Sequence, residues 1–192
     1  MGYHDRLDAT TVLQVTNPDS KDALRTAIAM SRIEAYLRAA TVQMRRLWRF
    51  ERRRLHSEPV YSHAMIQAFV EIHLYFICWA TIGRMMGIIK ARSRLRAPNT
   101  VYKRHRKVIK EYSAARDHLE HYDERLLGGK KTAALPNLSD FGNLHGRFYT
   151  FGGYRWDVGP DSLKQLKKIV TELDTGIRKE GLPKAKKGLH ID

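Results

Sequence analysis

The chain has 192 residues, enough for one domain with a well-buried core, and a formal net charge of +15. So large an excess of Lys and Arg favours polyanionic partners, nucleic acid before an anionic membrane surface. Cys78 is the sole cysteine, which excludes a disulfide framework and a cysteine-based zinc site. Because residues 1–22 also lack the apolar core of a secretory signal, we expect the protein in the reducing cytoplasm.

The first predicted helix begins at the capping residues and proline of segment 17–20 and extends to about Leu55. Its apolar residues recur at alternating spacings of three and four, the pattern of an amphipathic helix. These residues are Met30, Ile33, Leu37, Ala40, Met44 and Leu47. Pro59 ends the pattern, because the residue before a proline disfavours the helical conformation. Residues 1–19 form an N-terminal segment outside this helix.

The second predicted helix, residues 60–95, contains an apolar segment at 64–89 that is long enough to suggest a membrane span. Four polar residues interrupt the segment: Gln67, Glu71, His73 and Arg84. Charged groups at bilayer depth are costly, and a helix that is apolar on nearly all sides also occurs at the centre of a helical bundle. We therefore predict a buried bundle helix, which can bend at Gly83 or Gly87, and no membrane contact.

The third predicted helix has the most regular apolar pattern of the chain. It ends at Gly128 and Gly129, a residue type that favours a left-handed C-terminal cap. Its seam of apolar and aromatic positions comprises Val101, His105, Val108, Tyr112, Ala115, Leu119, Tyr122 and Leu126. Residues 97–99, which include a proline, separate it from the second helix. Together the three helices predict a helical domain over residues 20–129.

After a loop through Pro136 the pattern changes to that of strands. Residues 146–159 predict two short aromatic strands around Gly152 and Gly153, a doublet that suits a type I′ hairpin turn. We therefore expect a mainly all-α fold, a bundle of long helices with an appended aromatic β-hairpin and a C-terminal helix.

The C-terminal helix is predicted to start near Pro160, with Ser162 and Gln165 spaced as a capping box. Residues 130–180, which hold the loop, the hairpin and this helix, are expected to pack on the helical domain. Residues 181–192 are expected to form a basic tail.

Two basic runs lie in the predicted helices. Six arginines crowd the end of the first helix, and residues 90–110 contain nine Lys or Arg and no acidic residue. A run of like charge is usually a solvated face, but its mutual repulsion is relieved when a polyanion binds. The runs lie on consecutive helices and could form one surface, for which we predict nucleic-acid contact. The candidate residues are Arg45, Arg49, Arg52, Arg53, Lys103, Arg104, Arg106 and Lys107.

Charged and titratable residues concentrate at the end of the third helix, in residues 114–129. At about 100° per residue, Asp117 and His121 lie one turn apart, so the carboxylate could orient the imidazole and raise its basicity. The alternative is an ion-pair ladder on one flank of the helix, which needs no chemistry. Its members would be Arg116, Glu120 and Asp123.

A metal site is the other chemistry that this stretch suggests. His118 and His121 are also one turn apart, close enough to share a metal ion. No third ligand lies nearby in the sequence, so we predict neither a metal nor another cofactor.

Residues 116–121, Arg-Asp-His-Leu-Glu-His, resemble the R-x4-H motif of the HEPN family, in which a polar residue directly follows the arginine. HEPN proteins are small and all-helical, and they carry this motif toward the end of a late helix. Many are metal-independent endoribonucleases, often toxins or antiviral effectors of prokaryotes, whereas others only bind RNA or partner proteins. The resemblance covers residues 20–129 and does not extend to the hairpin or the last helix.

Two positions depart from the common form of the family's pattern. Asp117 stands where asparagine is usual. Asp123 stands where members that are controlled by a nucleotidyltransferase antitoxin carry a tyrosine. We therefore do not expect an antitoxin of that kind, and the type of any antitoxin stays open.

The resemblance implies a catalytic set of Arg116, Asp117 and His121. His121 would act as general base or acid at the RNA 2′-hydroxyl, and Arg116 would neutralise the charge of the phosphorane. Asp117 would orient His121, and cleavage would leave a 2′,3′-cyclic phosphate. Arg116 and His121 lie about 140° apart around one helix, and the dimers of the family bring both residues of each subunit into one cleft. We therefore expect a homodimer that forms through the helix ending at Leu126.

Two other classes of function stay open. One is a non-catalytic nucleic-acid-binding or regulatory protein that uses its basic helices alone. The other is a helical interaction or scaffolding protein without a polyanionic partner.

Overall fold

The computed structural model describes residues 21–54, 63–121, 143–151 and 153–181. These residues form four helices and three short strands, so the mainly helical class predicted from the sequence is confirmed. In chain order they are α2 (Lys21–Arg54), α3 (His63–Arg92), α4 (Arg96–Glu120), β1 (Asn143–His145), β2 (Phe148–Phe151), β3 (Tyr154–Asp157) and α6 (Pro160–Gly181).

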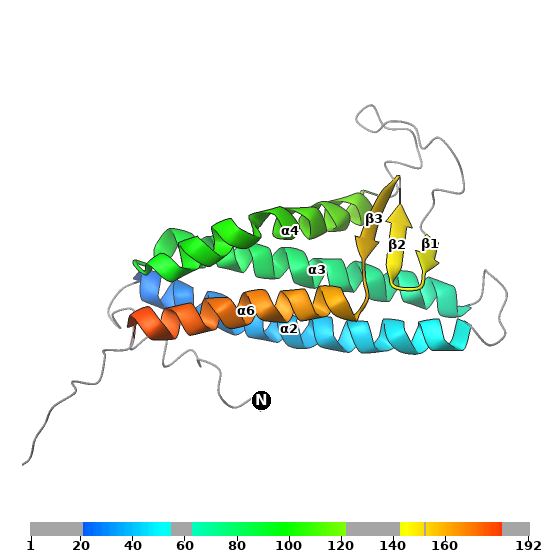
Figure 1. Ribbon diagram of the computed structural model, residues 1–192, viewed down its shortest axis with the longest axis horizontal. Coiled ribbons are helices and arrows are strands. Elements are labelled where there is room, and N and C mark those ends of the chain that lie inside the picture. Colours follow the sequence, from blue (N-terminus) through cyan, green and yellow to red (C-terminus); the bar gives the residue numbers. More distant parts are fainter. Residues whose placement is uncertain (1–20, 55–62, 122–142, 152, 182–192) are drawn as a thin grey trace, which may run out of the picture.

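The four helices form an antiparallel bundle (Figure 1). α2 and α4 run in one direction, and α3 and α6 run in the other. α3 packs against α2 and α4, and α6 closes the bundle against α4 and α2. α6 starts well inside the bundle, so the last turns of α2 and the first turns of α3 project beyond it (Figure 1). The sheet lies toward this end of the bundle, beside α3 and the end of α4.

The apolar seams predicted for the first and third helices face the core of the bundle. All six seam residues predicted for α2 are buried. On α4, Val101, Tyr112 and Ala115 are buried, and Val108 and Leu119 are partly buried against the same core. Because this seam is covered within the chain, it is not free to form the homodimer interface that its pattern suggested.

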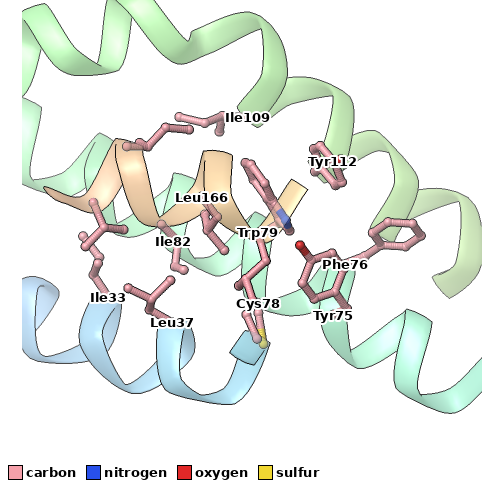
Figure 2. Packing of buried hydrophobic residues seen from close by; sticks show 14 of the residues in the cluster. Ile33, Leu37, Tyr75, Phe76, Cys78, Trp79, Ile82, Ile109, Tyr112 and Leu166 are labelled. Carbon is pink, nitrogen blue, oxygen red and sulfur yellow. The ribbon is translucent and has the colours of Figure 1, made fainter. Parts of the chain in front are cut away.

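α3 supplies the largest side chains of the core (Figure 2). Tyr75, Phe76 and Trp79 are fully buried, and the indole of Trp79 stacks on the ring of Tyr112 with 4.1 Å between the centroids. The span Ile66–Arg92 is long and apolar enough to cross a membrane, and 56% of its apolar window is buried inside the protein. α3 thus occupies the position that we predicted for a buried bundle helix.

Gly83 of α3 has a packing role rather than the bend that the sequence suggested. The side chain of Ile109 of α4 occupies the space where a β-carbon on residue 83 would lie. Any larger residue at this position would push α4 away from α3, because interiors are close-packed.

The appended sheet has three antiparallel strands in the order β1-β2-β3. The predicted hairpin is confirmed as β2 and β3, in which Phe151 pairs with Tyr154. Gly153, in the turn between them, has a positive φ of 76°, as its residue type allows. β1 was missed, because Leu144 is its sole apolar residue and no alternation marks it.

Aromatic residues of the sheet join it to α3. Tyr149 lies 6.0 Å from Phe69 and 6.1 Å from Phe76, measured between ring centroids. Trp156 lies 5.9 Å from Phe76 in an edge-on arrangement. The sheet and α6 therefore share one hydrophobic core with the helices of residues 20–129.

The predicted boundaries of α4 are wrong at both ends. α4 begins at Arg96, and Pro98 lies in its first turn, where a missing N–H costs no helical hydrogen bond. The helix ends at Glu120 instead of Leu126. His121 is its C-cap, with φ −103° and ψ 28°, outside the helical range. Residues 122–142, which include the rest of the predicted helix, lie outside the described residues.

The capping box predicted at the start of α6 is also wrong. Ser162 lies inside the first turn, where its hydroxyl donates to the carbonyl of Gly159 at 2.8 Å and bonds with the Tyr75 hydroxyl. The side chain of Asp157 instead accepts the N–H of Gly159 at 2.7 Å. Pro160 starts the helix, as predicted.

Candidate functional site

Arg116 lies near the end of α4, and its guanidinium group is held between two carboxylates of the same helix. One terminal nitrogen is 2.6 Å from Asp117 Oδ1, and the other is 2.6 Å from Glu120 Oε2. The side chain is 24% exposed, and its buried Nε has no hydrogen-bond partner. The predicted ladder is therefore present for Arg116 and Glu120, whereas its third member, Asp123, lies outside the described residues.

Asp117 lies beside Arg116 on α4, and the orientation of His121 by its carboxylate stays a prediction. Its carboxylate pairs with Arg116, and its carbonyl accepts a hydrogen bond of 3.2 Å from the His121 N–H. Both side chains are exposed.

His118 packs against the sheet, a contact that the sequence did not reveal. Its ring lies 4.8 Å from that of Tyr154 and 5.6 Å from that of Trp156, between centroids. One turn and a half earlier on α4, the Tyr112 hydroxyl donates to the carbonyl of Asp157 at 2.7 Å. β3 therefore fixes the end of α4 that carries Arg116, which gives the aromatic strand a positioning role.

The two basic runs do not form one surface, contrary to our expectation. The first lies at the end of α2, and the second spans the end of α3 and the first half of α4. Because α2 and α3 are antiparallel, these segments lie at opposite ends of the bundle (Figure 1). Arg45 and Arg49 are exposed, whereas the side chains of Arg52 and Arg53 lie outside the described part of the chain.

The predicted cations of α4 divide into two groups. Arg104 faces α6, where it lies 3.0 Å from Glu172 Oε2, and His105 Nε2 lies 2.9 Å from the same oxygen. These contacts, the His105 hydrogen bond first, lower the pKa of Glu172. Lys103, Arg106 and Lys107 are exposed and form no ion pair within the described part of the chain.

An exposed strip on α4 joins the free cations to the motif. Six residues at spacings of three and four lie on this outward side of the helix, and all are exposed. They are Lys103, Lys107, Lys110, Ala114, Asp117 and His121. We call them the outer strip of α4. It leads along one face from three lysines to the exposed imidazole, with Arg116 directly beside it.

Comparisons of the chain with family models, with curated proteins and with solved structures found no match.

Proposed function

We propose that the protein is a metal-independent endoribonuclease of the HEPN type, acting as a toxin or as an antiviral or stress effector. The observation that carries the proposal is the outer strip of α4. A single strand of RNA that follows it meets Lys103, Lys107 and Lys110 through its phosphates and arrives at His121 and Arg116. Single-stranded RNA suits such a surface, because its backbone can follow a helix face.

In this proposal His121 removes the proton of the RNA 2′-hydroxyl or protonates the leaving 5′-oxygen. Its imidazole is solvent-exposed at the helix end, so a substrate can reach it. Arg116 stabilises the negative charge that develops on the phosphorane, a task for which a planar guanidinium fork is well shaped. Asp117 pairs with Arg116 and positions its guanidinium group.

Arg116 must exchange partners to perform this role. Its two carboxylate contacts lie on the surface of one helix, where such pairs contribute little to stability. A phosphodiester carries one negative charge and two non-bridging oxygens, so the guanidinium can bind it with two hydrogen bonds as it binds a carboxylate. The additional negative charge of the phosphorane strengthens this contact in the transition state. The buried Nε, which lacks a partner, is a further donor for the same group.

A homodimer remains part of the proposal, but it requires another interface. Arg116 and His121 diverge around α4, so a second copy would bring complementary residues to the cleavage site. Because the apolar seam of α4 is buried within the chain, the two copies would meet through exposed surface at the ends of their α4 helices.

A non-catalytic RNA-binding or regulatory protein is the second candidate. It is favoured by the same two ion pairs of Arg116, which neutralise the guanidinium in the absence of RNA. In that case the outer strip would bind RNA, and the motif would be a charged helix end.

The deciding experiment is RNA cleavage in the presence of EDTA, with wild-type protein and His121→Ala. We expect wild-type protein to cut single-stranded RNA and to leave 2′,3′-cyclic phosphate ends, and His121→Ala to lose this activity. The exposed His145 of β1 provides a matched control, and His145→Ala should cleave normally. Binding without cleavage by the wild-type protein would favour the second candidate, and cleavage that persists in His121→Ala would refute the assigned role.

A further inference from the structure

A cavity of about 360 Å³ opens between the end of α2 and the start of α3, where these helices project beyond α6 (Figure 1). A volume of this size falls within the range of roughly 300–1,000 Å³ typical of sites for small organic groups. Its described lining residues are Arg46, Leu47, Arg49, Phe50, Gln67, Ala68 and Glu71. None of them belongs to the motif of α4 or to its outer strip.

Glu71 gives the cavity a buried acceptor. Its side chain is 7% exposed, and Oε1 accepts a hydrogen bond of 3.1 Å from Arg46. The other oxygen, Oε2, is buried without a hydrogen-bond partner. A buried carboxylate oxygen in this state is unfavourable, and a donor on a ligand would satisfy it.

The remaining lining residues surround this acceptor with complementary chemistry. Arg49 is exposed at the rim and forms no ion pair within the described residues, so it can bind an anion. Phe50 is partly buried and provides an aromatic wall. Gln67 lies one turn before Glu71 on α3, so both side chains project on the same face of the helix.

Access to Glu71 is controlled by Arg46. This arginine is 55% exposed and contacts Glu71 through a single hydrogen bond. It can therefore turn toward solvent without disturbing the core. A ligand that supplies its own donors to Glu71 would take its place.

We propose that this cavity binds a guanine base of single-stranded RNA. A carboxylate only accepts hydrogen bonds, and guanine is the base that presents two adjacent donors, N1–H and the N2 amino group, on its Watson–Crick edge. Adenine and cytosine place an acceptor beside their amino group, and uracil flanks its single N–H with two carbonyls. Glu71 accepts from N1–H and N2–H, Gln67 donates to O6, and Arg49 contacts the adjacent phosphate.

The inference rests on the proposed function in one respect, that the ligand is RNA, and it is independent of cleavage. The guanine site lies between the end of α2 and the start of α3, and the outer strip lies on α4. Its role would be to select the sequence that is bound, since a carboxylate pairing with two donors discriminates strongly between bases.

The test measures binding of uridine oligonucleotides with one central guanosine, inosine or adenosine. All sugars carry 2′-fluorine, so that no nucleophile is present and cleavage cannot interfere. By fluorescence anisotropy we expect the oligonucleotide with guanosine to bind about tenfold more tightly than the one with adenosine. Inosine, which lacks the N2 amino group, should fall between them. Equal affinity for all three oligonucleotides would overturn the proposal.

Variants of the protein test whether the preference for guanosine over adenosine comes from the cavity. Glu71→Gln should bind guanosine and adenosine oligonucleotides alike, whereas Glu34→Gln, an equal change of charge on the outer side of α2, should keep the wild-type preference. Arg49→Gln should lower the affinity for all three oligonucleotides by a similar factor and leave their order of affinity unchanged. A folded Glu71→Gln protein that retains the full preference would contradict the assignment.

A second variant, at the exposed residue Gln67, tests the site if Glu71→Gln does not fold. Gln67→Ala should fold normally and lower the preference for guanosine over adenosine, and an unchanged preference would refute the site. The outcomes also separate the two proposals. Guanosine preference without cleavage of natural RNA contradicts the ribonuclease alone, and cleavage without base preference contradicts the guanine site alone.

Discussion

Arg104 and Arg116 lie on the same helix and both meet carboxylates, but their partners differ in kind. Arg104 reaches across the bundle to Glu172 of α6. Arg116 pairs with two neighbours on α4 itself, Asp117 and Glu120. An ion pair that joins two helices is lost when they separate, whereas a pair between residues of one helix can form and break without moving the fold. Arg104 thus serves the tertiary structure, and Arg116 is free to change partners.

The burial of the two arginines sharpens this difference. The ion pair of Arg104 joins two helices, and the Arg104 side chain is 60% exposed. The ion pairs of Arg116 stay within one helix, and the Arg116 side chain is only 24% exposed. Arg116 also keeps a buried N–H without a partner. The guanidinium group is thus paired at both terminal nitrogens but not at Nε, and a buried donor without a partner costs stability.

Arg116→Lys should produce the largest effect. Lysine keeps the positive charge and can still pair with Glu120, but it lacks the planar fork that fits a phosphorane. We expect the rate of RNA cleavage to fall by at least about 100-fold, as when one transition-state donor is removed. The midpoint of urea unfolding should stay at the wild-type value, because surface pairs within a helix add little stability.

Arg104→Lys provides the matched control for this experiment. It makes the same exchange on the same helix, at a residue that contacts α6 rather than the motif. It should cleave RNA at the wild-type rate. If both variants lose activity equally, or if neither does, the distinction between a structural and a functional arginine on α4 does not hold.

The sequence predicted the features that depend on the periodicity of a single helix. The seams of α2 and α4 were correct, because burial of one face imposes the helical period on the apolar residues. The local pair of Arg116 with Glu120 was anticipated for the same reason, since residues four apart lie on one face. The long-range partner of Arg104 carries no such signature.

Contacts between distant segments could not be predicted. His118 meets Tyr154 across more than thirty residues of chain, and nothing in the spacing of either residue points to the other. The end of α4 at Glu120 was also hidden, because the apolar pattern continues to Leu126 in the sequence. Periodicity records which face is apolar, but it does not record where a helix stops.

The separation of the two basic runs could have been predicted. A short connection between two long helices makes them antiparallel neighbours. The end of α2 and the end of α3 must then lie at opposite ends of the bundle, and the runs that they carry cannot merge. The run on α4 continues that of α3, which leaves the first run to a separate surface.

Glu172→Gln should have a smaller effect, on stability. It removes the carboxylate that Arg104 and His105 share, and we expect the free energy of unfolding to fall by about 1 kcal/mol. The pKa of Glu172 is lowered below its ordinary value of 4.5, so its contribution is present above pH 4.5 and is lost as the pH falls through the folded-state pKa. Urea unfolding between pH 3 and pH 6 (a range of about three units around the titration) measures both effects.

Glu120→Gln is the control for this change in stability, because Glu120 is a partner of Arg116 and not of Arg104. Glu120→Gln removes one partner of Arg116, and we expect a loss of only about 0.3–0.5 kcal/mol, as for other pairs four residues apart on a helix. A loss as large as that of Glu172→Gln would show that the pair near the motif also supports the fold. A Glu172→Gln difference that persists unchanged at the lowest pH would contradict the role of its ionised carboxylate.

The smallest expected effect concerns binding to RNA. Lys107 lies on the outer strip of α4 and forms no ion pair within the described residues, whereas Arg104 is paired with Glu172. If RNA follows the strip, Lys107→Gln should reduce the slope of log affinity against log salt by about 0.7, the value for one phosphate contact with a single strand. Arg104→Gln removes a charge of the same sign from the same half of α4, but one that Glu172 already neutralises, so its slope should stay at the wild-type value. Binding of an oligouridine without a guanine isolates the strip from any site on α2 and α3. Equal slopes for the two variants would mean that RNA responds to the net charge of α4 and not to a defined path, and the line from the lysines to His121 would then lose its support.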